Sequence, residues 1–458
     1  MTRTRAPVHP PVVTTIAGSD SGGGAGIQAD LKTIEAGGGF GTSVVTAVTA
    51  QHTRGVESSH LLPREEIEAQ LAAVWSDFDV EAIKTGMLGT REIVDSVTDA
   101  LADVEVPVVV DPVMVAGSGD RLFDEAAESA YETLAREATL ITPNAREATV
   151  LTDVEVESTA AAQQAGEILR SEGLAPVLVT GGHLEGEEIT DVLVTESGVE
   201  RFRHPCVETP GTHGSGCTLS AAIATRLAHG DDLVPAVRTA IDLLDRAVRY
   251  GIDVGEGPGP VHHMVAIRNR AERDATAEAV SDVVQEFVAR NVSPLVPEVG
   301  MNVVGATPYA ESPNECAAVE GRIGRTREGV APTGGVRFDA SSHVARFLLA
   351  AREFDPDFRF ALNCRFDERV ESVLESVDWP VTSFLRGDQP ADVEKQEAST
   401  MEWSARQVFE RETVHPVVIF DRGAHGKEPM TRVLAGDSMT LVERTMTLLD
   451  GVESLSSQ

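Results

Sequence analysis

The sequence lacks the features on which several large classes of protein depend. No run of about 18 apolar residues occurs, and residues 1–11 lack the apolar stretch of a secretion signal, so we expect no membrane span and a cytoplasmic location. The cysteines form no C-x-x-C pair, which excludes a zinc knuckle and a disulfide framework and predicts reduced thiols. These cysteines are Cys206, Cys217, Cys316 and Cys364.

Positive charge is also scarce. The chain has 38 lysine and arginine residues against 73 acidic residues, and its formal net charge is −35. Nucleic acid is therefore a poor partner, because phosphate backbones require a basic face. The acidic residues are scattered along the chain and only four lysines occur, a pattern typical of proteins from salt-loving archaea, in which hydrated carboxylates keep a protein soluble. An acidic protein from an ordinary cell is the alternative.

The length and the apolar pattern predict two α/β domains. From residue 11 to about 250, short apolar runs alternate with longer stretches rich in alanine, leucine and glutamate, which predicts repeated βα units and a doubly wound, mostly parallel sheet. The expected strands are Val12–Ala17, Val44–Ala50, Ala82–Lys84, Val106–Val110, Leu140–Thr142 and Val177–Thr180.

A segment rich in glycine and proline, 251–264, interrupts this rhythm and precedes an expected helix from Ala266 to Asn291. We therefore place a first domain at 1–268 and a separate, smaller α/β domain at 269–458. The end of the chain, 453–458, is expected to be a frayed tail.

A glycine-rich turn, 18–26, follows the first expected strand. Glycines let the backbone approach a ligand closely, and a turn from strand to helix points N–H groups toward it. Residues 24–29 formally fit a dinucleotide fingerprint, but the next strand does not end in a clear acidic residue, and no G-x-x-x-x-G-K-[ST] sequence occurs. We therefore expect neither a nicotinamide site nor a P-loop.

Short motifs also follow other expected strands, at the strand ends where doubly wound sheets gather their ligands. Each of them alone fits a capped turn, but together they indicate one site. Their candidate site residues are Gln51, Met87, Asp111, Asn144 and Glu147. A second glycine-rich stretch, 211–218, runs into an expected helix at Leu219–Leu227, whose free N–H groups and dipole suit a phosphate in transfer.

The segments AGSDSGGGAGIQADLKT, TAQHT, KTGML, DPVMV, TPNAREA, GGH and THGSGCTLSAAIA occur in the order found in the hydroxymethylpyrimidine and hydroxymethylpyrimidine-phosphate kinases. Residues 12–265 resemble that ribokinase-like family. The resemblance implies a ribokinase-like fold, ATP and Mg²⁺ as cofactors, and, by analogy, a homodimer.

It also implies the roles of individual residues. Gln51 would hydrogen-bond the aminopyrimidine in a pocket lined by Gly18, Asp30, Met87 and Val113. Asp111, Asn144 and Glu147 would organise Mg²⁺ and the ATP phosphates, with Asp111 and Glu147 as metal ligands. The anion hole would be built from the segment Thr212, Gly214, Ser215, Gly216 and Cys217.

Cys217 occupies the place where the wider superfamily has an aspartate base, so the resemblance implies that its thiol accepts the proton of the substrate hydroxyl. This requires a lowered pKa, which a helix N-terminus can provide. A small buried residue behind the anion hole is the alternative. Two positions depart from the family: His52 replaces an asparagine, and Thr180 replaces a lysine. Pyridoxal kinases share this fold, so a vitamin B6 kinase is the nearest alternative.

The second domain gathers arginines on glycine-rich turns, in GRIGRTR at 321–327 and GGVRFDASSH at 334–343. Guanidinium forks suit phosphate or pyrophosphate, while surface salt bridges with neighbouring glutamates are the alternative.

The segments NVVGATPYA, EGRIGRTREGVAPTGGVRFDASSHVARFLLAAREFDP and PVVIFDRGAHGKEPMTRVLA resemble the archaeal-type thiamine-phosphate synthase domain over roughly 275–450. The resemblance implies that Arg322 and His343 are catalytic and stabilise the departing pyrophosphate while the nitrogen of thiazole phosphate attacks. A related domain acts as a ligand sensor behind a helix-turn-helix, so a kinase with a sensing domain is the second hypothesis. The retention of both residues, without a helix-turn-helix candidate, favours catalysis.

Overall fold

The computed structural model describes residues 7–102, 104–114, 128–182, 188–384, 397–424 and 426–456. Contacts divide the chain into two compact units, Met1–Ala266 and Ile267–Gln458. The sequence placed the boundary after residue 268. No helix among the described residues is long and apolar enough to cross a membrane. All four cysteines are free thiols.

The first unit is built on a nine-stranded sheet in the order β3-β2-β1-β4-β5-β6-β7-β8-β9. Its strands are β1 (Val12–Asp20), β2 (Phe40–His52), β3 (Gly55–Leu61), β4 (Val80–Thr85), β5 (Val108–Val110), β6 (Leu140–Ile141), β7 (Val177–Val179), β8 (Glu188–Thr195) and β9 (Gly198–Pro205). The neighbours in the central part of the sheet, β2-β1-β4-β5-β6-β7, pair in parallel. At the two edges, β3 pairs antiparallel with β2, β8 with β7, and β9 with β8. The predicted doubly wound, mostly parallel sheet is confirmed.

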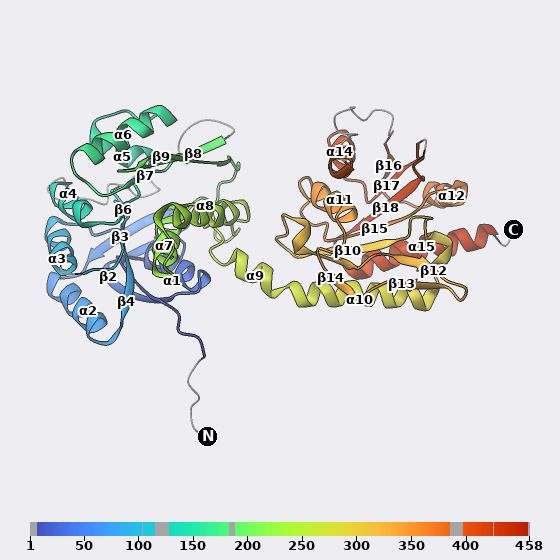
Figure 1. Cartoon of the computed structure of the whole chain (residues 1–458), viewed down its shortest axis with the longest axis horizontal. Coiled ribbons are helices and arrows are strands. Elements are labelled where there is room, and N and C mark those ends of the chain that lie inside the picture. Colours follow the sequence, from blue (N-terminus) through green and yellow to red (C-terminus); the bar gives the residue numbers. More distant parts are fainter. Residues whose placement is uncertain are drawn as a thin grey trace, which may run out of the picture. The chain divides into compact units, whose positions relative to one another are not determined.

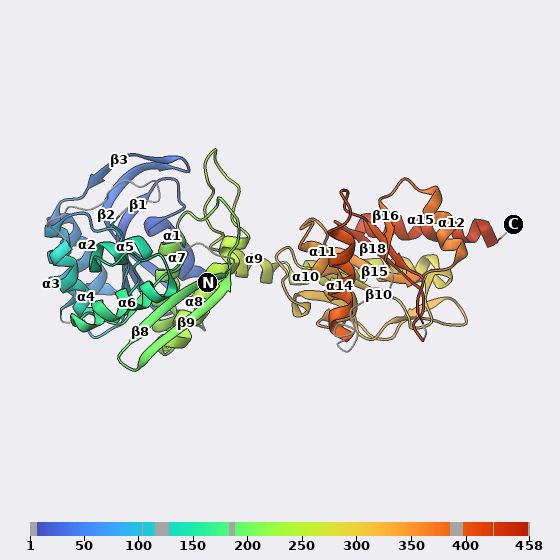
Figure 2. The same ribbon diagram turned by 90° about the horizontal axis from the view of Figure 1, so that it is seen from above.

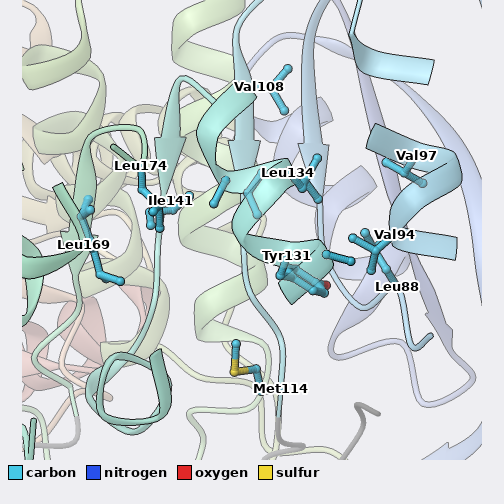
Figure 3. Close-up of a cluster of buried hydrophobic side chains, with 14 of the residues drawn as sticks. Leu88, Val94, Val97, Val108, Met114, Tyr131, Leu134, Ile141, Leu169 and Leu174 are labelled. Carbon is cyan, nitrogen blue, oxygen red and sulfur yellow. The ribbon is translucent and has the colours of Figure 1, made fainter. Parts of the chain in front are cut away.

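Helices cover both faces of this sheet (Figures 1 and 2). They are α1 (Gly26–Ala36), α2 (Arg64–Asp77), α3 (Arg91–Leu101), α4 (Glu128–Glu137), α5 (Ala145–Thr152), α6 (Thr159–Ser171), α7 (Ser215–Ala228) and α8 (Leu233–Arg249). Helices α2 to α6 pack their buried side chains on one face, and α1, α7 and α8 pack theirs on the other. Figure 3 shows part of the first core, where Val94 and Val97 of α3 lie near Tyr131 and Leu134 of α4.

The second unit contains a seven-stranded sheet in the order β14-β11-β10-β15-β18-β17-β16, and a separate β12-β13 hairpin. The strands are β10 (Asn302–Ala306), β11 (Cys316–Val319), β12 (Ile323–Arg325), β13 (Val330–Pro332), β14 (Val336–Phe338), β15 (Phe360–Arg365), β16 (Val381–Ser383), β17 (Val418–Asp421) and β18 (Met430–Ala435). Its described neighbours are antiparallel, apart from β16 and β17.

Helices again lie on both faces of the second sheet. They are α10 (Arg273–Arg290), α11 (His343–Arg352), α12 (Glu368–Ser376), α14 (Glu397–Phe409) and α15 (Ser438–Ser456), with short 3₁₀ turns at Ser293–Leu295 and Pro313–Glu315. The boundary between the two units falls within a further helix, α9 (Val265–Ala271). Buried residues of α10, α12 and α15 share one core, and those of α11 and α14 share the other. The prediction of a separate, smaller α/β domain is therefore confirmed.

Two local predictions were wrong. The single helix expected from Ala266 to Asn291 is two helices, α9 and α10, because the backbone of Glu272 between them has a ψ of −5°. The tail expected to fray is helical as far as Ser456. It is held there because Val452 is buried in the core and the guanidinium of Arg369 donates to the Ser456 hydroxyl at 2.8 Å.

We predict that Phe287→Ala destabilises the second unit by about 3 to 5 kcal/mol, because this α10 side chain is fully buried and its removal leaves a cavity. Its neighbour Val288 is 42% exposed, so Val288→Ala should change the free energy of unfolding by less than about 0.5 kcal/mol. Urea unfolding followed by Trp379 and Trp403 fluorescence, in a Trp75→Phe background, measures both. Equal losses in the two variants would contradict the core assignment.

Candidate active site

The candidate site lies at the carboxyl ends of the parallel strands of the first unit. Gly18 is near the end of β1 and Gln51 near the end of β2, while Asp111 directly follows β5 and Asn144 caps α5 after β6. The N-terminus of α7 reaches the same edge, since a Cβ placed on Gly216 would lie 3.8 Å from Oδ2 of Asp111. The fold therefore brings together residues from five separate segments of the sequence.

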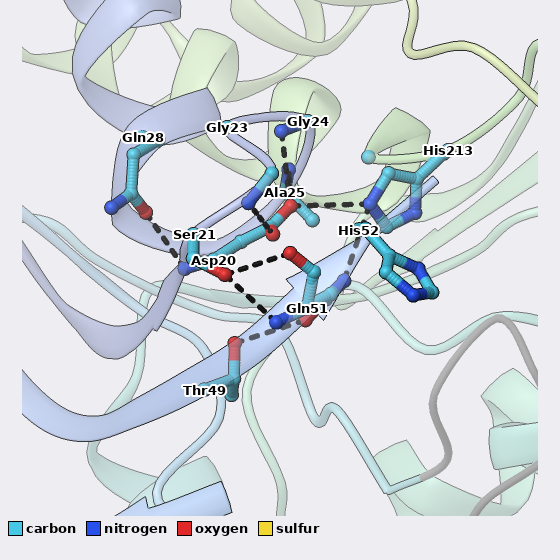
Figure 4. A network of polar contacts seen from close by, with 12 residues as sticks. Asp20, Ser21, Gly23, Gly24, Ala25, Gln28, Thr49, Gln51, His52 and His213 are labelled. Atoms are coloured by element: carbon cyan, nitrogen blue, oxygen red, sulfur yellow. Dashed lines mark hydrogen bonds and ion pairs between the residues drawn. The ribbon is translucent and has the colours of Figure 1, made fainter. Parts of the chain in front are cut away.

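Asp20 organises the first glycine-rich turn. Its carboxylate accepts hydrogen bonds from the backbone N–H groups of Gly22 at 2.7 Å, Gly24 at 3.0 Å and Ala25 at 2.8 Å (Figure 4). Burial alone would raise the pKa of Asp20, but the hydrogen bonds from His213 and from the backbone hold it below its usual value. The carboxylate is therefore ionised and shapes the turn around itself.

The two glycine-rich segments touch through their backbones. Gly214, the residue that precedes α7, has a φ of 81°, and a Cβ there would lie 1.9 Å from the carbonyl oxygen of Gly24. A Cβ on Gly26, at a φ of 56°, would lie 2.3 Å from the carbonyl oxygen of Gly18. Only glycine fits both positions, so the sequence requirement comes from close packing as well as from backbone conformation.

Gln51 ends β2 beside these turns. Its carboxamide lies 3.2 Å from the hydroxyl of Thr49 and 3.3 Å from Nε2 of His213 (Figure 4). Gly18 and Met87 are neighbours, because a Cβ on Gly18 would lie 3.3 Å from the sulfur of Met87. Val113 is half-buried, and its N–H donates to the carbonyl oxygen of Asp111 at 2.8 Å.

Asp30 does not have the place that the sequence resemblance implied for it. Its side chain is fully buried, and Oδ2 accepts from Nζ of Lys84 at 2.9 Å and from the hydroxyl of Thr15 at 2.6 Å. Asp30 therefore forms an interior ion pair and lies behind the site, and it does not line an open pocket.

Asp111 and Glu147 form a pair of buried carboxyls. Burial raises the pKa of Asp111 to about 6, although the charge of Lys84 opposes the rise. Burial and then the charge of Asp111 raise the pKa of Glu147 to about 8, against the lowering effect of N–H donors from Asn144 and Met114. Glu147 and Asn144 also make a capping box at the start of α5, in which each side chain accepts from the backbone of the other.

These two carboxyls fit a magnesium ion. Burial disfavours the ionised form of each carboxyl, and a bound divalent cation would offset the free energy needed to ionise them. Among the described residues no group of three metal-binding side chains exists. Mg²⁺ is commonly held by one or two carboxylates together with substrate phosphates, and Asp111 and Glu147 supply two carboxylates.

The expected lowering of the Cys217 pKa was wrong for the ligand-free chain. Burial raises the pKa of this thiol to about 12, the nearby charges of Asp30 and Asp111 add to the rise, and Lys84 and the N–H of Gly26 oppose it. The helix N-terminus was visible in the sequence, but the buried carboxyls around the thiol were not. In the same segment Thr212 and Gly216 are exposed, and the N–H of Ser215 donates to the carbonyl oxygen of Thr212.

In the second unit, the two residues predicted to be catalytic lie on different segments. Arg322 is exposed just before β12, with its N–H donating to the hydroxyl of Thr333 at 2.8 Å, and His343 is the exposed first residue of α11. Arg337 forms an ion pair with Glu320 at 2.7 Å, as the salt-bridge alternative expected for that arginine. Arg322 and Arg337 are therefore both exposed, and Arg337 is also ion-paired.

Sequence reasoning assigned no role to three residues that build the site. Asp20 and His213 lie within the two quoted glycine-rich segments, and the contact between their side chains at 3.2 Å joins residues 193 positions apart. Lys84 is a fully buried lysine on a core strand. A lysine inside an apolar run, in a chain with four lysines, was the signal that could have revealed it. His183, in the GGH segment, lies outside the described residues.

The fold and the site define a kinase of the ribokinase-like class. The ADP complex of Bacillus subtilis pyridoxal kinase matches with a TM-score of 0.54 and 32% identity over 57% of this chain and 99% of that one. Staphylococcus aureus pyridoxal kinase, in complex with AMP-PCP and pyridoxal, matches with a TM-score of 0.53 and 31% identity over 57% and 96%.

Sequence comparison identifies the family. Residues 20–262 match the family model described as phosphomethylpyrimidine kinase, and residues 279–447 match that of thiamine-phosphate synthase ThiN. A hydroxymethylpyrimidine/phosphomethylpyrimidine kinase of Streptomyces coelicolor is 45% identical over 57% of this chain and 98% of its own length. The bifunctional thiamine biosynthesis protein ThiED of Geobacter sulfurreducens is 43% identical over 59% of this chain and 55% of its length.

The chain therefore belongs to the phosphomethylpyrimidine kinase family. It joins a thiamine-biosynthesis kinase domain to a thiamine-phosphate synthase domain.

We predict that Glu147→Gln flattens the dependence of stability on pH. The native pKa of about 8 exceeds the ordinary value of 4.5, so the native state binds more protons and loses stability as the pH rises through this window. The free energy of unfolding of the wild type relative to the variant should fall by about 1 kcal/mol per pH unit. Urea unfolding followed by Trp75 fluorescence measures it, with exposed Glu137→Gln as the control. A difference that is constant with pH would contradict the raised pKa.

Proposed function

We propose that the first unit transfers phosphate from ATP twice, first to 4-amino-5-hydroxymethyl-2-methylpyrimidine and then to the resulting monophosphate. The second unit condenses the pyrophosphate product with thiazole phosphate to give thiamine phosphate. The observation that supports the kinase step is the convergence of the Asp111 and Glu147 carboxyls with the N-terminus of α7 at one sheet edge. Phosphoryl transfer depends on such positioning and charge neutralisation.

Each polar group at this edge has a separate task. Gln51 binds the aminopyrimidine, with Gly18, Met87 and Val113 beside it. The N–H groups of Gly214, Gly216 and Cys217, with Thr212, receive the phosphate that is transferred, because a helix N-terminus favours negative charge. The N–H of Ser215 donates to the carbonyl oxygen of Thr212 and shapes this turn. Asp111 and Glu147 hold Mg²⁺, which neutralises charge on the ATP phosphates, and Asn144 fixes the position of Glu147 through the capping box.

Cys217 is the candidate group that accepts the proton of the substrate hydroxyl. Its thiol is protonated at neutral pH in the ligand-free chain, partly because of the charge of Asp111. Asp111, which would hold the cation, supplies part of the charge that disfavours the thiolate, so a bound cation would lower the pKa of Cys217.

The chemistry of the two units forms a sequence. The pyrimidine pyrophosphate made by the first unit is the electrophile that the second unit consumes. Arg322 and His343 stabilise the departing pyrophosphate, and Arg322 suits this task because its planar fork matches phosphate oxygens. The enzyme works in the cytoplasm of a salt-adapted cell, where its net charge of −35 keeps it soluble, and we expect it to be a homodimer.

Pyridoxal is the second candidate substrate, because the two solved structures described above are pyridoxal kinases. The sequence relatives named as pyrimidine kinases are more similar, at 45% identity for that of Streptomyces coelicolor and 46% for that of Rhizobium meliloti. The pyrimidine is therefore the main substrate, with pyridoxal as a side activity.

We predict that Cys217→Ala lowers the kcat of pyrimidine phosphorylation by about 100-fold or more, with little change in KM, as expected for the loss of a general base. Wild-type kcat/KM should rise with pH on the alkaline side, because the free thiol has a pKa of about 12. The exposed Cys206 provides a matched control, and Cys206→Ala should keep wild-type activity. Undiminished phosphorylation by Cys217→Ala would remove the thiol from the mechanism.

We predict that Arg322→Ala abolishes thiamine phosphate formation while the pyrimidine pyrophosphate still accumulates. The assay contains hydroxymethylpyrimidine, ATP, Mg²⁺ and thiazole phosphate in high salt. Arg337→Ala is the control, because this arginine is paired with Glu320 and should leave the synthesis within about twofold of the wild type. Accumulation of the pyrophosphate by the wild type, without thiamine phosphate, would show that the second unit is a sensor or inactive.

A further inference from the structure

Nε2 of His213 lies between a carboxylate that can only accept a hydrogen bond and a carboxamide that can either donate or accept one. Nε2 of His213 is 3.2 Å from Oδ2 of Asp20 and 3.3 Å from Nε2 of Gln51 (Figure 4). The ionised carboxylate of Asp20 only accepts hydrogen bonds, so Nε2 of His213 must carry a hydrogen to bond with it. A protonated ring nitrogen cannot accept from the NH₂ group of Gln51. Nε2 has a single hydrogen, so it can share that hydrogen between Oδ2 of Asp20 and Gln51 only when the Gln51 carboxamide turns its oxygen toward His213.

Thr49, on the other side of Gln51, independently requires the same orientation of the carboxamide. The hydroxyl of Thr49 has one hydrogen, and it lies 2.8 Å from the carbonyl oxygen of Ser19 and 3.2 Å from Oε1 of Gln51. Once the hydrogen is donated to Ser19 at the shorter distance, the hydroxyl oxygen can only accept. It therefore requires the NH₂ group of Gln51 on its side. A half-turn of the carboxamide about its last bond satisfies Thr49 and His213 together.

The His213 ring is held firmly enough to impose this choice. A Cβ on Gly24 would lie 2.6 Å from Cδ2 of the ring, so the ring packs directly on the glycine-rich turn. The backbone of His213 is fixed as well, because its carbonyl oxygen accepts from the N–H of Val261 at 3.2 Å and its strand-like segment pairs with Pro260. Asp20 in turn is fixed by three backbone N–H groups. The imidazole, its tautomer and its carboxylate partner are thus set before a substrate binds.

We propose that His213, kept by Asp20 as the tautomer with hydrogen on Nε2, is a positioning residue that fixes the direction of the Gln51 carboxamide and thereby makes the site select an aminopyrimidine over its oxo analogue. The inference rests on the proposed function in one respect, namely that Gln51 contacts the pyrimidine. A 4-aminopyrimidine offers a ring-nitrogen acceptor beside an amino donor, whereas the 4-oxo analogue offers a ring N–H donor beside a carbonyl acceptor. A carboxamide of fixed direction pairs with the first and opposes the second.

The test measures the dissociation constants of hydroxymethylpyrimidine and of its 4-oxo analogue by calorimetry, without nucleotide, in the full chain. His213→Leu should lower the preference for the amino compound by about tenfold, the effect of one hydrogen bond. His213→Gln should restore most of the preference, because its amide nitrogen can donate to both Asp20 and Gln51. His229→Leu, at an exposed histidine that contacts the carbonyl oxygen of Gly37, is the control. Equal weakening of both ligands by His213→Leu, with the preference unchanged, overturns the proposal.

A second measurement is independent of any substrate. Nitrogen chemical shifts of the ligand-free, ¹⁵N-histidine-labelled chain report which ring nitrogen of His213 carries hydrogen, with His213→Gln identifying its signals. A hydrogen on Nε2 is expected, and an Nε2 without hydrogen overturns the proposal. If the wild type binds neither pyrimidine, the proposed substrate is wrong, and the tautomer alone decides whether His213 can set the direction of Gln51.

Discussion

The buried ion pair of Lys84 and Asp30 is the interaction on which the electrostatics of the first unit depends. Both side chains are fully buried, and the pair joins β4 to α1 beneath the site. Burial alone would lower the pKa of Lys84, but Asp30, Cys217 and Asp111 raise it, so the ammonium group keeps its charge. Burial raises the pKa of both Asp111 and Cys217, and the charge of Lys84 opposes this rise. Loss of either partner would leave an uncompensated buried charge, at a cost of about 3 to 5 kcal/mol.

The close backbone approach of the two glycine-rich segments adds a steric constraint to this electrostatic one. Because Gly214 packs on the carbonyl oxygen of Gly24, the N-terminus of α7 cannot move without the turn that Asp20 organises. His213 lies in the same segment as Gly214 and contacts Gln51. The group that we propose to bind the pyrimidine and the N–H groups that we propose to bind the phosphate are therefore parts of one packed assembly, which would keep the reacting hydroxyl and the transferred phosphate in a fixed relation.

Several parts of this arrangement could be predicted from the sequence, and the reasons are physical. The parallel strands are buried on both faces, so their apolar runs were recognisable, whereas β9 exposes most of its residues and reads as a polar loop. The candidate residues at strand ends could be recognised because the carboxyl ends of parallel strands meet at one edge of a sheet, where ligands bind. The Lys84–Asp30 pair spans 54 positions and the Asp20–His213 pair spans 193, and local patterns do not report such pairings. The raised pKa of Cys217 was missed for the same reason, because its causes lie on other segments.

In the proposed function both units bind anionic substrates, although the net charge of the chain is −35. The proposed phosphate segment of the first unit, 211–218, contains no lysine or arginine and would rely on backbone N–H groups, which attract phosphate without adding a charge that could pair with nearby carboxylates. The second unit would use arginines on exposed turns, where such pairing does occur, since Arg337 forms an ion pair with Glu320. High salt screens exposed charges more than buried ones. Salt should therefore weaken anion binding in the second unit more than in the first, because only the second depends on exposed charged side chains.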